Sequence, residues 1–423
     1  MSLWETFGFK KNPFDAKWLE VSEEGYNLFV GREAQTKQFQ TTISSTQGGL
    51  IIVEGGVGVG KTSFVNVQQY ISFKEKIKKT PKLLPCFEPI SIQPPINQFD
   101  VLLSILSSCV YSFIYLYGEE KIKRDKQLNR IYSVVNQTLH KTSSVQLGAV
   151  IPPGIGASFG LGKSAFQTTP VGVSLHILIQ ALDKLVEVMR KKYQFDGISV
   201  TINNLDIVNE EDVITFFDRF RDILTNRKYF WWIFIGPEGL FSLLETKRSR
   251  VSEIFIGQPT LLPPLSYGNI KEAIERRIKH FRLKTGIKSP VPEEVVKILY
   301  ETSKGEIRFI FKRLTDFIIE FKTKYPSAKF LNYSESIYTL KNLIGRRLNE
   351  VNLTDAEQNM LQKFSRVDNF RPKDFKLFGL ISAQSLSKYI KKFIQLRLLY
   401  RSQTGKAAIY RCSGDVKLFF SEL

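Results

Sequence analysis

The chain has 423 residues, of which 43% are hydrophobic and 24% charged, an ordinary globular composition that can bury a large core in two or three domains. The formal net charge of +19 favours a polyanionic partner. Nucleic acid is the commonest such partner, and acidic membranes or proteins are the alternatives. The three cysteines are isolated and odd in number, which excludes a cysteine-based zinc site and favours a reducing, cytoplasmic setting.

The N-terminal segment carries no recognisable secretion signal. Residues 1 to 24 lack a basic start followed by an apolar stretch and a small-residue cleavage site, so we expect a protein that is not secreted. Next, FVGRE at Phe29 to Glu33 precedes an expected helix through Thr42. If a nucleotide site follows, this pattern places Val30 on the face of the adenine base and Arg32 near the nucleotide. Alone it is a common pattern.

The most specific motif is LIIVEGGVGVGKTSFVNVQQ, from Leu50 to Gln69. Leu50 to Val53 is an apolar run suited to a buried parallel strand, and Gly-x4-Gly-Lys-Thr before a helix-compatible segment is the phosphate-loop (P-loop) pattern. Its backbone N–H groups would converge on phosphates at a helix N-terminus. Lys61 would reach the β- and γ-phosphates, and Thr62 would ligate Mg²⁺. The expected nucleotide-binding residues are Gly55, Gly56, Val57, Gly58, Val59, Gly60, Lys61, Thr62 and Ser63.

With FVGRE some 20 residues before GGVGVGKTS, the chain resembles AAA+ ATPases, especially the replication initiators and origin-recognition proteins. Its opening, WETFGFKKNPFD at Trp4 to Asp15, is similar to the start of bacterial secretion ATPases and transposition helpers. The resemblance implies an α/β fold with a parallel-sheet AAA+ core at 1–265, a helical lid at 266–340 and a winged-helix domain at 341–423. It also implies ATP and Mg²⁺ as cofactors.

The core is expected to contain a long insertion. Between a second strand near Phe87 to Ile92 and a strand at Ile198 lie roughly a hundred residues, including two helical stretches, Phe99 to Tyr117 and Lys123 to His140. The uncharged run from Val101 to Tyr117 has 17 residues, fewer than the roughly 20 of a membrane span, so a buried helix is expected. Residues 143–170 are rich in Gly, Ser and Pro and predict a projecting loop that either contacts DNA or a partner protein or is disordered.

The segment ISVTINNLD, residues 198 to 206, stands where the family keeps an acidic pair on its second P-loop strand. In the first register, Asn203 occupies the magnesium-side position and Asn204 the position of the water-activating glutamate. An asparagine has no basic carboxylate and binds magnesium less strongly, so hydrolysis should be slow. In the alternative register Asp206 is the functional acid. A buried strand and turn without catalytic role is the third interpretation.

Three further elements follow from the resemblance. KYFWWIFIGPEG, residues 228 to 239, predicts the central strand beside the P-loop strand, ending at Gly236 without the usual polar sensor. Arg250, with Arg248 as second choice, would reach the γ-phosphate of a neighbouring subunit, and a surface arginine is the alternative. In TSKGEIRFIFKRLTDFI, residues 302 to 318, Arg308 would contact the γ-phosphate of its own chain.

The C-terminal segment, 341–423, carries 16 Lys and Arg against 7 Asp and Glu. Thr354 and Glu357 form a capping box at the start of one helix, RPKDFKLFG predicts a second, and ISAQSLSKYIKKFIQLRLLY predicts a third. Two strands around Gln-Thr-Gly-Lys complete a winged-helix pattern. A protein contact, or a merely solvated charge run, is the alternative to DNA binding. The expected DNA-binding residues are Lys388, Lys391, Lys392 and, at the hairpin tip, Lys406.

These patterns together predict an ATP-binding AAA+ protein that binds double-stranded DNA through its winged helix and self-associates when ATP is bound. Nucleotide state would control assembly or the loading of a partner, with slow hydrolysis of the acid anhydride or none. The alternative is a nucleotide-gated signalling scaffold that contacts an unidentified protein rather than DNA. A membrane-associated secretion ATPase is a third interpretation, opposed by the lack of a spanning segment.

Overall fold

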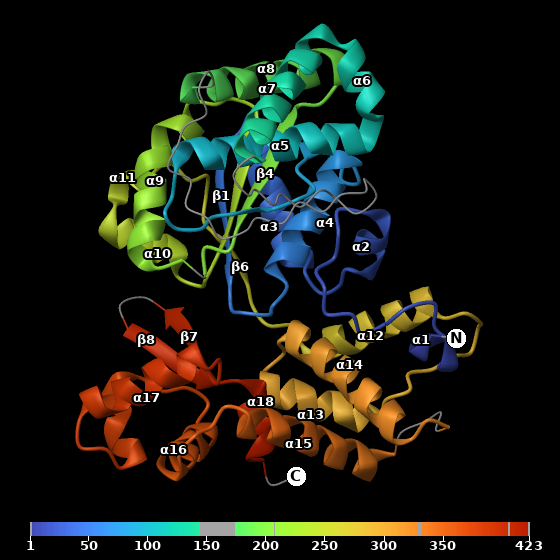
Figure 1. Cartoon of the computed structure of the whole chain (residues 1–423), viewed down its shortest axis with the longest axis vertical. Helices are drawn as coiled ribbons and strands as arrows, with labels where there is room; N and C mark the ends of the chain where they lie inside the picture. The colour runs from blue at the N-terminus through green and yellow to red at the C-terminus, as the bar shows by residue number, and fades with distance from the viewer. Residues whose placement is uncertain (1, 144–173, 207, 328–331, 405–406, 422–423) are drawn as a thin grey trace.

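A parallel β-sheet organises the N-terminal half of the protein (Figure 1). The computed structural model describes residues 2–143, 174–206, 208–327, 332–404 and 407–421. The strand order is β2-β4-β5-β1-β6, with β3 pairing β4. The strands are β1 (Gly49–Gly55), β2 (Leu83–Pro85), β3 (Ile90–Ser91), β4 (Gly197–Asn203), β5 (Phe230–Gly236) and β6 (Thr260–Leu262). Because every pairing is parallel, the carboxyl ends of β1, β4 and β5 meet at one edge, where α/β sheets bind ligands.

The prediction that residues 228–236 form the central strand beside the P-loop strand is confirmed. β5 pairs with β1 in parallel register, with Ile52 opposite Phe234. All seven residues of β5 are buried, as expected of a strand with both faces covered. β1 is therefore held between β5 and β6, and the loop that follows it starts from a rigid base.

The prediction of one second strand near Phe87 to Ile92 was wrong. Two short pieces, β2 and β3, pair with successive parts of β4. Pro85 ends the first piece and Pro89 precedes the second. Because proline has no backbone N–H to donate to a ladder, the chain leaves the sheet between them and then rejoins it.

Helices cover both faces of the sheet. On one face, α3 (Glu33–Ser44) and α4 (Lys61–Phe73) pack Phe39 and Phe64 against Ile51 and Val53 of β1. On the other face, longer helices cover the alternate side chains of the same strands. Because successive side chains of a strand point to opposite faces, the sheet lies between two separate cores. The helices of that second core are α5 (Gln98–Tyr117), α8 (Leu175–Tyr193) and α9 (Glu210–Thr225). Four further helices contribute buried side chains to it: α6 (Glu119–Arg124), α7 (Lys126–Ser143), α10 (Leu240–Lys247) and α11 (Ser249–Ser252).

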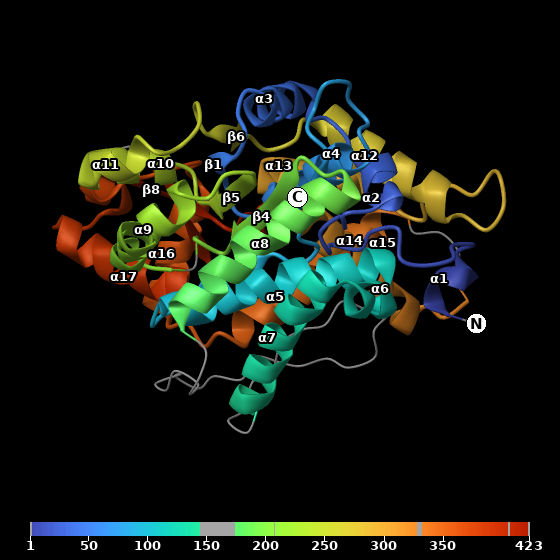
Figure 2. The same ribbon diagram turned by 90° about the horizontal axis from the view of Figure 1, so that it is seen from above.

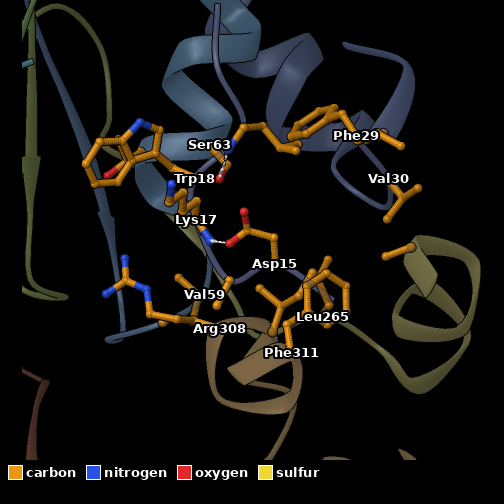
Figure 3. A pocket seen from close by; sticks show the side chains of 18 of the residues that line it. Asp15, Lys17, Trp18, Phe29, Val30, Val59, Ser63, Leu265, Arg308 and Phe311 are labelled. Carbon is orange, nitrogen blue, oxygen red and sulfur yellow. Dashed lines mark hydrogen bonds between the residues drawn. The ribbon is translucent and has the colours of Figure 1, made fainter. Parts of the chain in front are cut away.

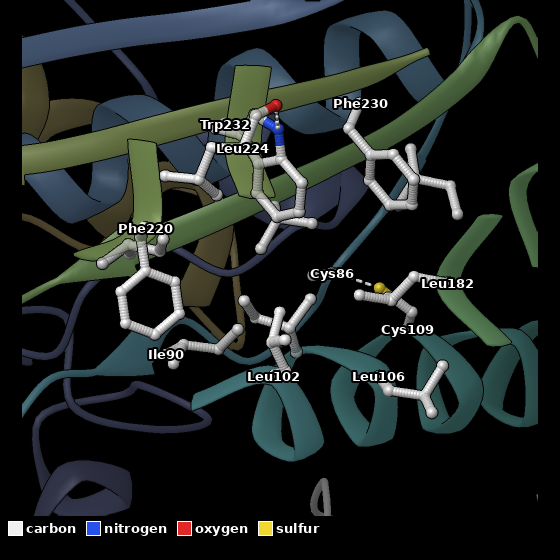
Figure 4. Packing of buried hydrophobic residues seen from close by; sticks show 14 of the residues in the cluster. Cys86, Ile90, Leu102, Leu106, Cys109, Leu182, Phe220, Leu224, Phe230 and Trp232 are labelled. Carbon is white, nitrogen blue, oxygen red and sulfur yellow. Dashed lines mark hydrogen bonds between the residues drawn. The ribbon is translucent and has the colours of Figure 1, made fainter. Parts of the chain in front are cut away.

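Helix α5 is the one helix in the described parts of the chain that is long and apolar enough to cross a membrane. Here it is a core helix, with Leu102 and Leu106 fully buried beneath Phe230 and Trp232 of β5 (Figure 4). Cys109 of α5 also meets Cys86, their Sγ atoms lying 3.2 Å apart in this core. Two cysteines that are isolated in the sequence are thus neighbours in the fold.

A helical lid and a C-terminal module share a third core below the sheet (Figures 1 and 2). The lid comprises α12 (Tyr267–Phe281), α13 (Glu293–Ser303), α14 (Ile307–Lys324) and α15 (Tyr333–Asn349). The boundary expected between residues 340 and 341 falls inside α15. The N-terminal segment, with α1 (Leu3–Thr6) and α2 (Glu23–Leu28), joins the lid through buried Phe9 and Phe14 and a bridge from Phe9 to Arg282.

The C-terminal module follows α15 and has the predicted order of three helices and a hairpin. Its elements are α16 (Asp355–Ser365), the 3-10 helix η1 (Pro372–Phe378), α17 (Ala383–Gln395), β7 (Leu399–Thr404), β8 (Ala407–Cys412) and α18 (Gly414–Phe419). The capping box of Thr354 and Glu357 is confirmed. Asp415 of α18 accepts hydrogen bonds from Arg313 of α14 at 2.6 Å and from Arg347 of α15 at 2.6 Å. Asp415 and Arg313 are buried, and these contacts fix the module to the lid.

Candidate nucleotide site

The P-loop turns directly from β1 into α4. β1 ends at Gly55 and α4 begins at Lys61, after Gly60 with a φ of +94°. That left-handed conformation is open to glycine at no steric cost, which explains the residue at this position. The first N–H groups of the 13-residue α4 have no partner within the helix, so they are available to an anion.

The side chain of Lys61 folds back onto the loop. Its side chain is 8% exposed, and its Nζ donates to the carbonyls of Gly55 at 2.8 Å and Gly56 at 2.9 Å. The same Nζ lies 3.7 Å from the carboxylate of Asp206. Burial lowers the pKa of Lys61, while the charge of Asp206 opposes that shift. The ammonium group therefore lies where it can exchange carbonyl partners for phosphate oxygens.

Asn203 lies beside Thr62, as the first register predicts. It ends β4, and its Nδ2 donates to Thr62 Oγ1 at 3.2 Å. Its Oδ1 accepts the backbone N–H of Asn204 at 2.8 Å, so the two bonds together define the orientation of the amide. The amide turns its NH₂ toward Thr62, whereas Mg²⁺ prefers oxygen ligands. The threonine hydroxyl fits Mg²⁺, and Asn203 in this orientation fits it poorly.

Asn204 and Asp206 point to different places. Asn204 adopts a left-handed φ of +65°, and its Nδ2 donates to Ser91 Oγ of β3 at 2.8 Å. Asp206, two residues farther on, is the acid whose carboxylate approaches Lys61. The structure thus combines features of both registers: Asn203 contacts Thr62, the residue expected to ligate Mg²⁺, and Asp206 faces the loop.

A pocket opens beside the loop, enclosing about 670 Å³ of space that is continuous with solvent. Apolar side chains of Val30, Leu265 and Phe311 surround it (Figure 3). Trp18, 52% exposed, also lines it. Apolar walls next to the P-loop suit a planar base, and Val30, the residue expected to cover the adenine, is one of the residues that line this pocket.

Arg32 links the P-loop to the segment that follows β6. Its side chain is almost fully buried, and it donates to the carbonyls of Val59 at 2.9 Å and Pro263 at 2.6 Å. Burial lowers the pKa of Arg32 to about 10. It lines the pocket, as expected of a residue near the nucleotide, but its guanidinium is engaged with backbone that it holds in place.

One wall of the pocket was missed by the sequence reasoning. The N-terminal segment Asp15 to Leu19 lines it and is tied to α4, because the Leu19 N–H donates to Ser63 Oγ at 3.0 Å. Arg277 of α12 donates to the Asp15 carbonyl at 2.9 Å from the opposite side. The sequence signal for this wall was the family-like segment WETFGFKKNPFD, which ends at Asp15, the first residue of the wall. The resemblance of that segment implies no role in a nucleotide site.

The lid brings Arg308 to the P-loop. Its backbone N–H donates to the Gly58 carbonyl at 3.2 Å, and the residue lines the pocket. This approach depends on Gly305, whose φ is +84° and where a Cβ would lie 2.4 Å from the Leu265 carbonyl oxygen. The structure therefore brings Lys61, Thr62, Asn203 and Arg308 around one loop.

The two arginine-finger candidates lie elsewhere. Arg250, on α11, is exposed and does not line the pocket, as required of a residue that would act on a neighbouring subunit. Arg248 pairs with Asp218 at 3.0 Å. At the end of β5, the buried carboxylate of Glu54 accepts the backbone N–H of Gly239 at 3.0 Å and so orders the turn where a polar sensor was expected to be missing.

The predicted DNA-binding lysines differ in their surroundings. Lys388 and Lys391 are exposed on α17, whereas Lys392 is paired with Glu357 at 2.6 Å. Lys406 and residues 144–170 of the expected loop lie outside the described residues. In the part of the chain that the structure describes, no three His, Cys, Asp or Glu side chains are grouped to hold a metal ion.

No protein-family model and no curated protein matches this sequence. Among solved structures, the ORC2 protein of Aeropyrum pernix in its ADPNP–ADP complexes is 13% identical, with a TM-score of 0.47, 97% of this chain and 96% of that one covered. The ORC1 protein of the same organism in complex with DNA is 11% identical, with a TM-score of 0.46 and 95% and 96% covered. Drosophila ORC bound to DNA is 12% identical, with a TM-score of 0.39 and 100% and 91% covered. The chain is thus similar in structure to these ORC proteins along nearly its whole length, at low sequence identity.

Proposed function

We propose that this protein binds ATP between its P-loop and lid and binds double-stranded DNA through its C-terminal module, used as a winged helix. The observation that carries the proposal is the convergence of Lys61, Thr62 and Arg308 on one loop beside an apolar pocket. The loop supplies N–H groups and Lys61 a positive charge for phosphates, while the pocket accepts a base. Three free cysteines support a reducing, cytoplasmic compartment.

Hydrolysis by this site is proposed to be slow. Asn203 and Asn204 provide no carboxylate to take a proton from water, and Asp206 is the nearest acid. Bound Mg²⁺ would neutralise phosphate charge, with Thr62 as its protein ligand. ATP would then act chiefly as a ligand that selects one arrangement of core and lid, and so controls self-association and the loading of a partner.

DNA binding is supported by the charge of the module and by the exposed lysines Lys388 and Lys391 of α17. The alternative, a signalling scaffold that contacts protein, is supported by the same exposed helix, which fits a partner of either kind. Salt dependence separates them, because DNA binding that depends on phosphate contacts weakens steeply as salt rises. A scaffold would change oligomeric state with ATP and ignore DNA.

The test of nucleotide binding uses Trp18, which is half exposed beside the pocket, whereas Trp231 and Trp232 are buried in the sheet. Titration with ATP should change the emission of the wild type, and calorimetry should give the same dissociation constant. Trp18→Phe should lose the optical signal and keep the calorimetric one, while Lys61→Ala should lose both. A wild type that shows no heat of binding with ATP or ADP would overturn the proposal.

A further inference from the structure

An ion pair between two distant segments lies directly against the P-loop. Arg411 of β8, in the C-terminal module, is paired with Glu306, the residue before α14 of the lid. The two side chains are 17% and 6% exposed, so the pair is largely removed from water. Figure 1 shows the hairpin of β7 and β8 between the rest of the module and the sheet core.

Both members of the pair approach glycines of the loop. A methyl group placed on Gly56 would lie 3.8 Å from Arg411 Nη2, and one placed on Gly58 would lie 3.6 Å from Glu306 Oε2. These are the glycines whose backbone is expected to surround the phosphates. A guanidinium from the third structural unit of the chain therefore stands at the phosphate site, beside Lys61 of the core and Arg308 of the lid.

The chemistry of this arrangement favours a role beyond holding two units together. A guanidinium has five N–H donors in a planar fork, so the contact with Glu306 leaves donors for phosphate oxygens. A carboxylate at the same loop repels phosphate, so polyphosphate and Glu306 compete for the same cation. Because a buried charge without a partner is costly, a phosphate that engages Arg411 changes the contact between hairpin and lid.

We propose that Arg411 is a phosphate-contacting residue which the C-terminal module contributes to the nucleotide site, with Glu306 as its positioning partner. This inference rests on the proposed binding of ATP. It deepens that function, because the terminal phosphate of a nucleoside triphosphate is then sensed by the hairpin itself. Asp415, four residues after Arg411, is bound by Arg313 and Arg347, so the signal reaches a module that is fixed to the lid.

The hairpin offers a matched control. Arg401 of β7 also ties the module to the rest of the chain, pairing with Glu210 of α9 at 3.3 Å, but its side chain is 46% exposed and approaches no glycine of the P-loop. Loss of Arg401 removes a contact between units without removing a cation from the P-loop. Arg411→Ala and Arg401→Ala therefore separate phosphate contact from domain docking.

The experiment measures the dissociation constants of ATP and ADP by calorimetry, with the full chain and Mg²⁺. Arg411→Ala should weaken ATP by about tenfold to a hundredfold, the worth of a hydrogen bond to a charged group, and ADP far less. Arg401→Ala should leave both constants unchanged. Glu306→Gln removes the competing charge and keeps the shape, so it should tighten ATP relative to ADP.

Three results would be decisive against the inference. If the wild type binds ATP and Arg411→Ala binds ATP and ADP with unchanged constants, the phosphate contact is refuted and the proposed function stands. If Arg411→Ala and Glu306→Gln weaken ATP and ADP equally, the pair only supports the fold. If the wild type binds no nucleotide, the proposed function fails, and this inference fails with it.

Discussion

The amide of Asn203 donates a hydrogen bond to the hydroxyl of Thr62, across 3.2 Å between the end of β4 and the start of α4. An aspartate at this position would present oxygen to a cation at the threonine, whereas the asparagine presents hydrogen. The protein thus keeps the contact between strand and P-loop while losing the negative charge. This exchange is the structural basis of the slow hydrolysis that we propose.

Restoring the acids should restore turnover. Asn203→Asp supplies an oxygen ligand beside Thr62, and Asn204→Glu supplies a base, which typically contributes a factor of about 10² to 10⁴. We expect the double variant to release phosphate from ATP at least about tenfold faster than the wild type. Phosphate release is measured with Lys61→Ala as the blank. An unchanged rate would show that hydrolysis is limited elsewhere, with Arg250 of a neighbouring subunit as the next candidate.

Gly305 should be more sensitive to substitution than another glycine of the same lid. Gly305→Ala forces a left-handed alanine and places its Cβ 2.4 Å from the Leu265 carbonyl oxygen. Gly286→Ala imposes a similar φ, +87°, with no atom within 4 Å, so it should cost only about 1 to 2 kcal/mol. The loss for Gly305→Ala should exceed this by about 1 kcal/mol or more. Urea unfolding of both variants checks the order, and equal losses would contradict it.

Stability should depend on pH through Glu306. Burial raises its pKa to about 7, against the opposing charges of Arg411 and Arg308. Between its ordinary value of 4.5 and 7, the folded state keeps a proton that the unfolded state has released. Stability therefore falls as pH rises through this window and levels off above it, by up to about 3 kcal/mol.

Glu306→Gln should remove that part of the pH dependence, because the amide does not titrate. The measurement compares the free energy of unfolding of variant and wild type at pH 5 and pH 8. Other carboxyls whose pKa is raised by burial, such as Glu54 and Glu88, titrate equally in both proteins and cancel from the difference. Parallel pH profiles would mean that Glu306 is ionised throughout.

The lysines of α17 should contribute unequally to DNA affinity. Lys388→Ala and Lys391→Ala should each flatten the dependence of log affinity on log salt by about one unit, as expected for a lost phosphate contact. Lys392→Ala should change the slope less, because Lys392 is paired with Glu357. Fluorescence anisotropy with a labelled duplex over a salt series measures all three. Equal slopes for all three variants would show that the ion pair with Glu357 does not keep Lys392 from contacting a DNA phosphate.

Local patterns predicted what depends on near neighbours in the chain. The loop from Gly55 to Thr62, the strand beside it and the capping box of Thr354 follow from spacing and residue type. The bounds of the second strand were less predictable, because Pro85 and Pro89 divide into β2 and β3 a strand that hydrophobicity alone would make continuous. The exposure of Lys388 and Lys391 on α17 was also predictable. The pairing of Lys392 with Glu357 of α16 was not.

Contacts between remote segments could not be read from the sequence. Arg411 and Glu306 are 105 residues apart, and no spacing in the sequence relates one to the other. Asp15 to Leu19 reach the pocket only because Leu19 bonds to Ser63, 44 residues on. Such contacts arise when the lid, the N-terminal segment and the module close on a common core, an outcome of tertiary packing that no local pattern encodes.

If ATP selects one arrangement of core and lid, as we propose, the nucleotide bound at the P-loop should also change the affinity of the C-terminal module for DNA. The most direct measurement is the affinity for a labelled DNA duplex at fixed salt with ATP, with ADP and without nucleotide, for the wild type and Lys61→Ala. We expect the wild-type affinity for DNA with ATP to differ from that with ADP, and Lys61→Ala to abolish the difference. Wild-type DNA affinity that is identical in all three conditions would contradict it.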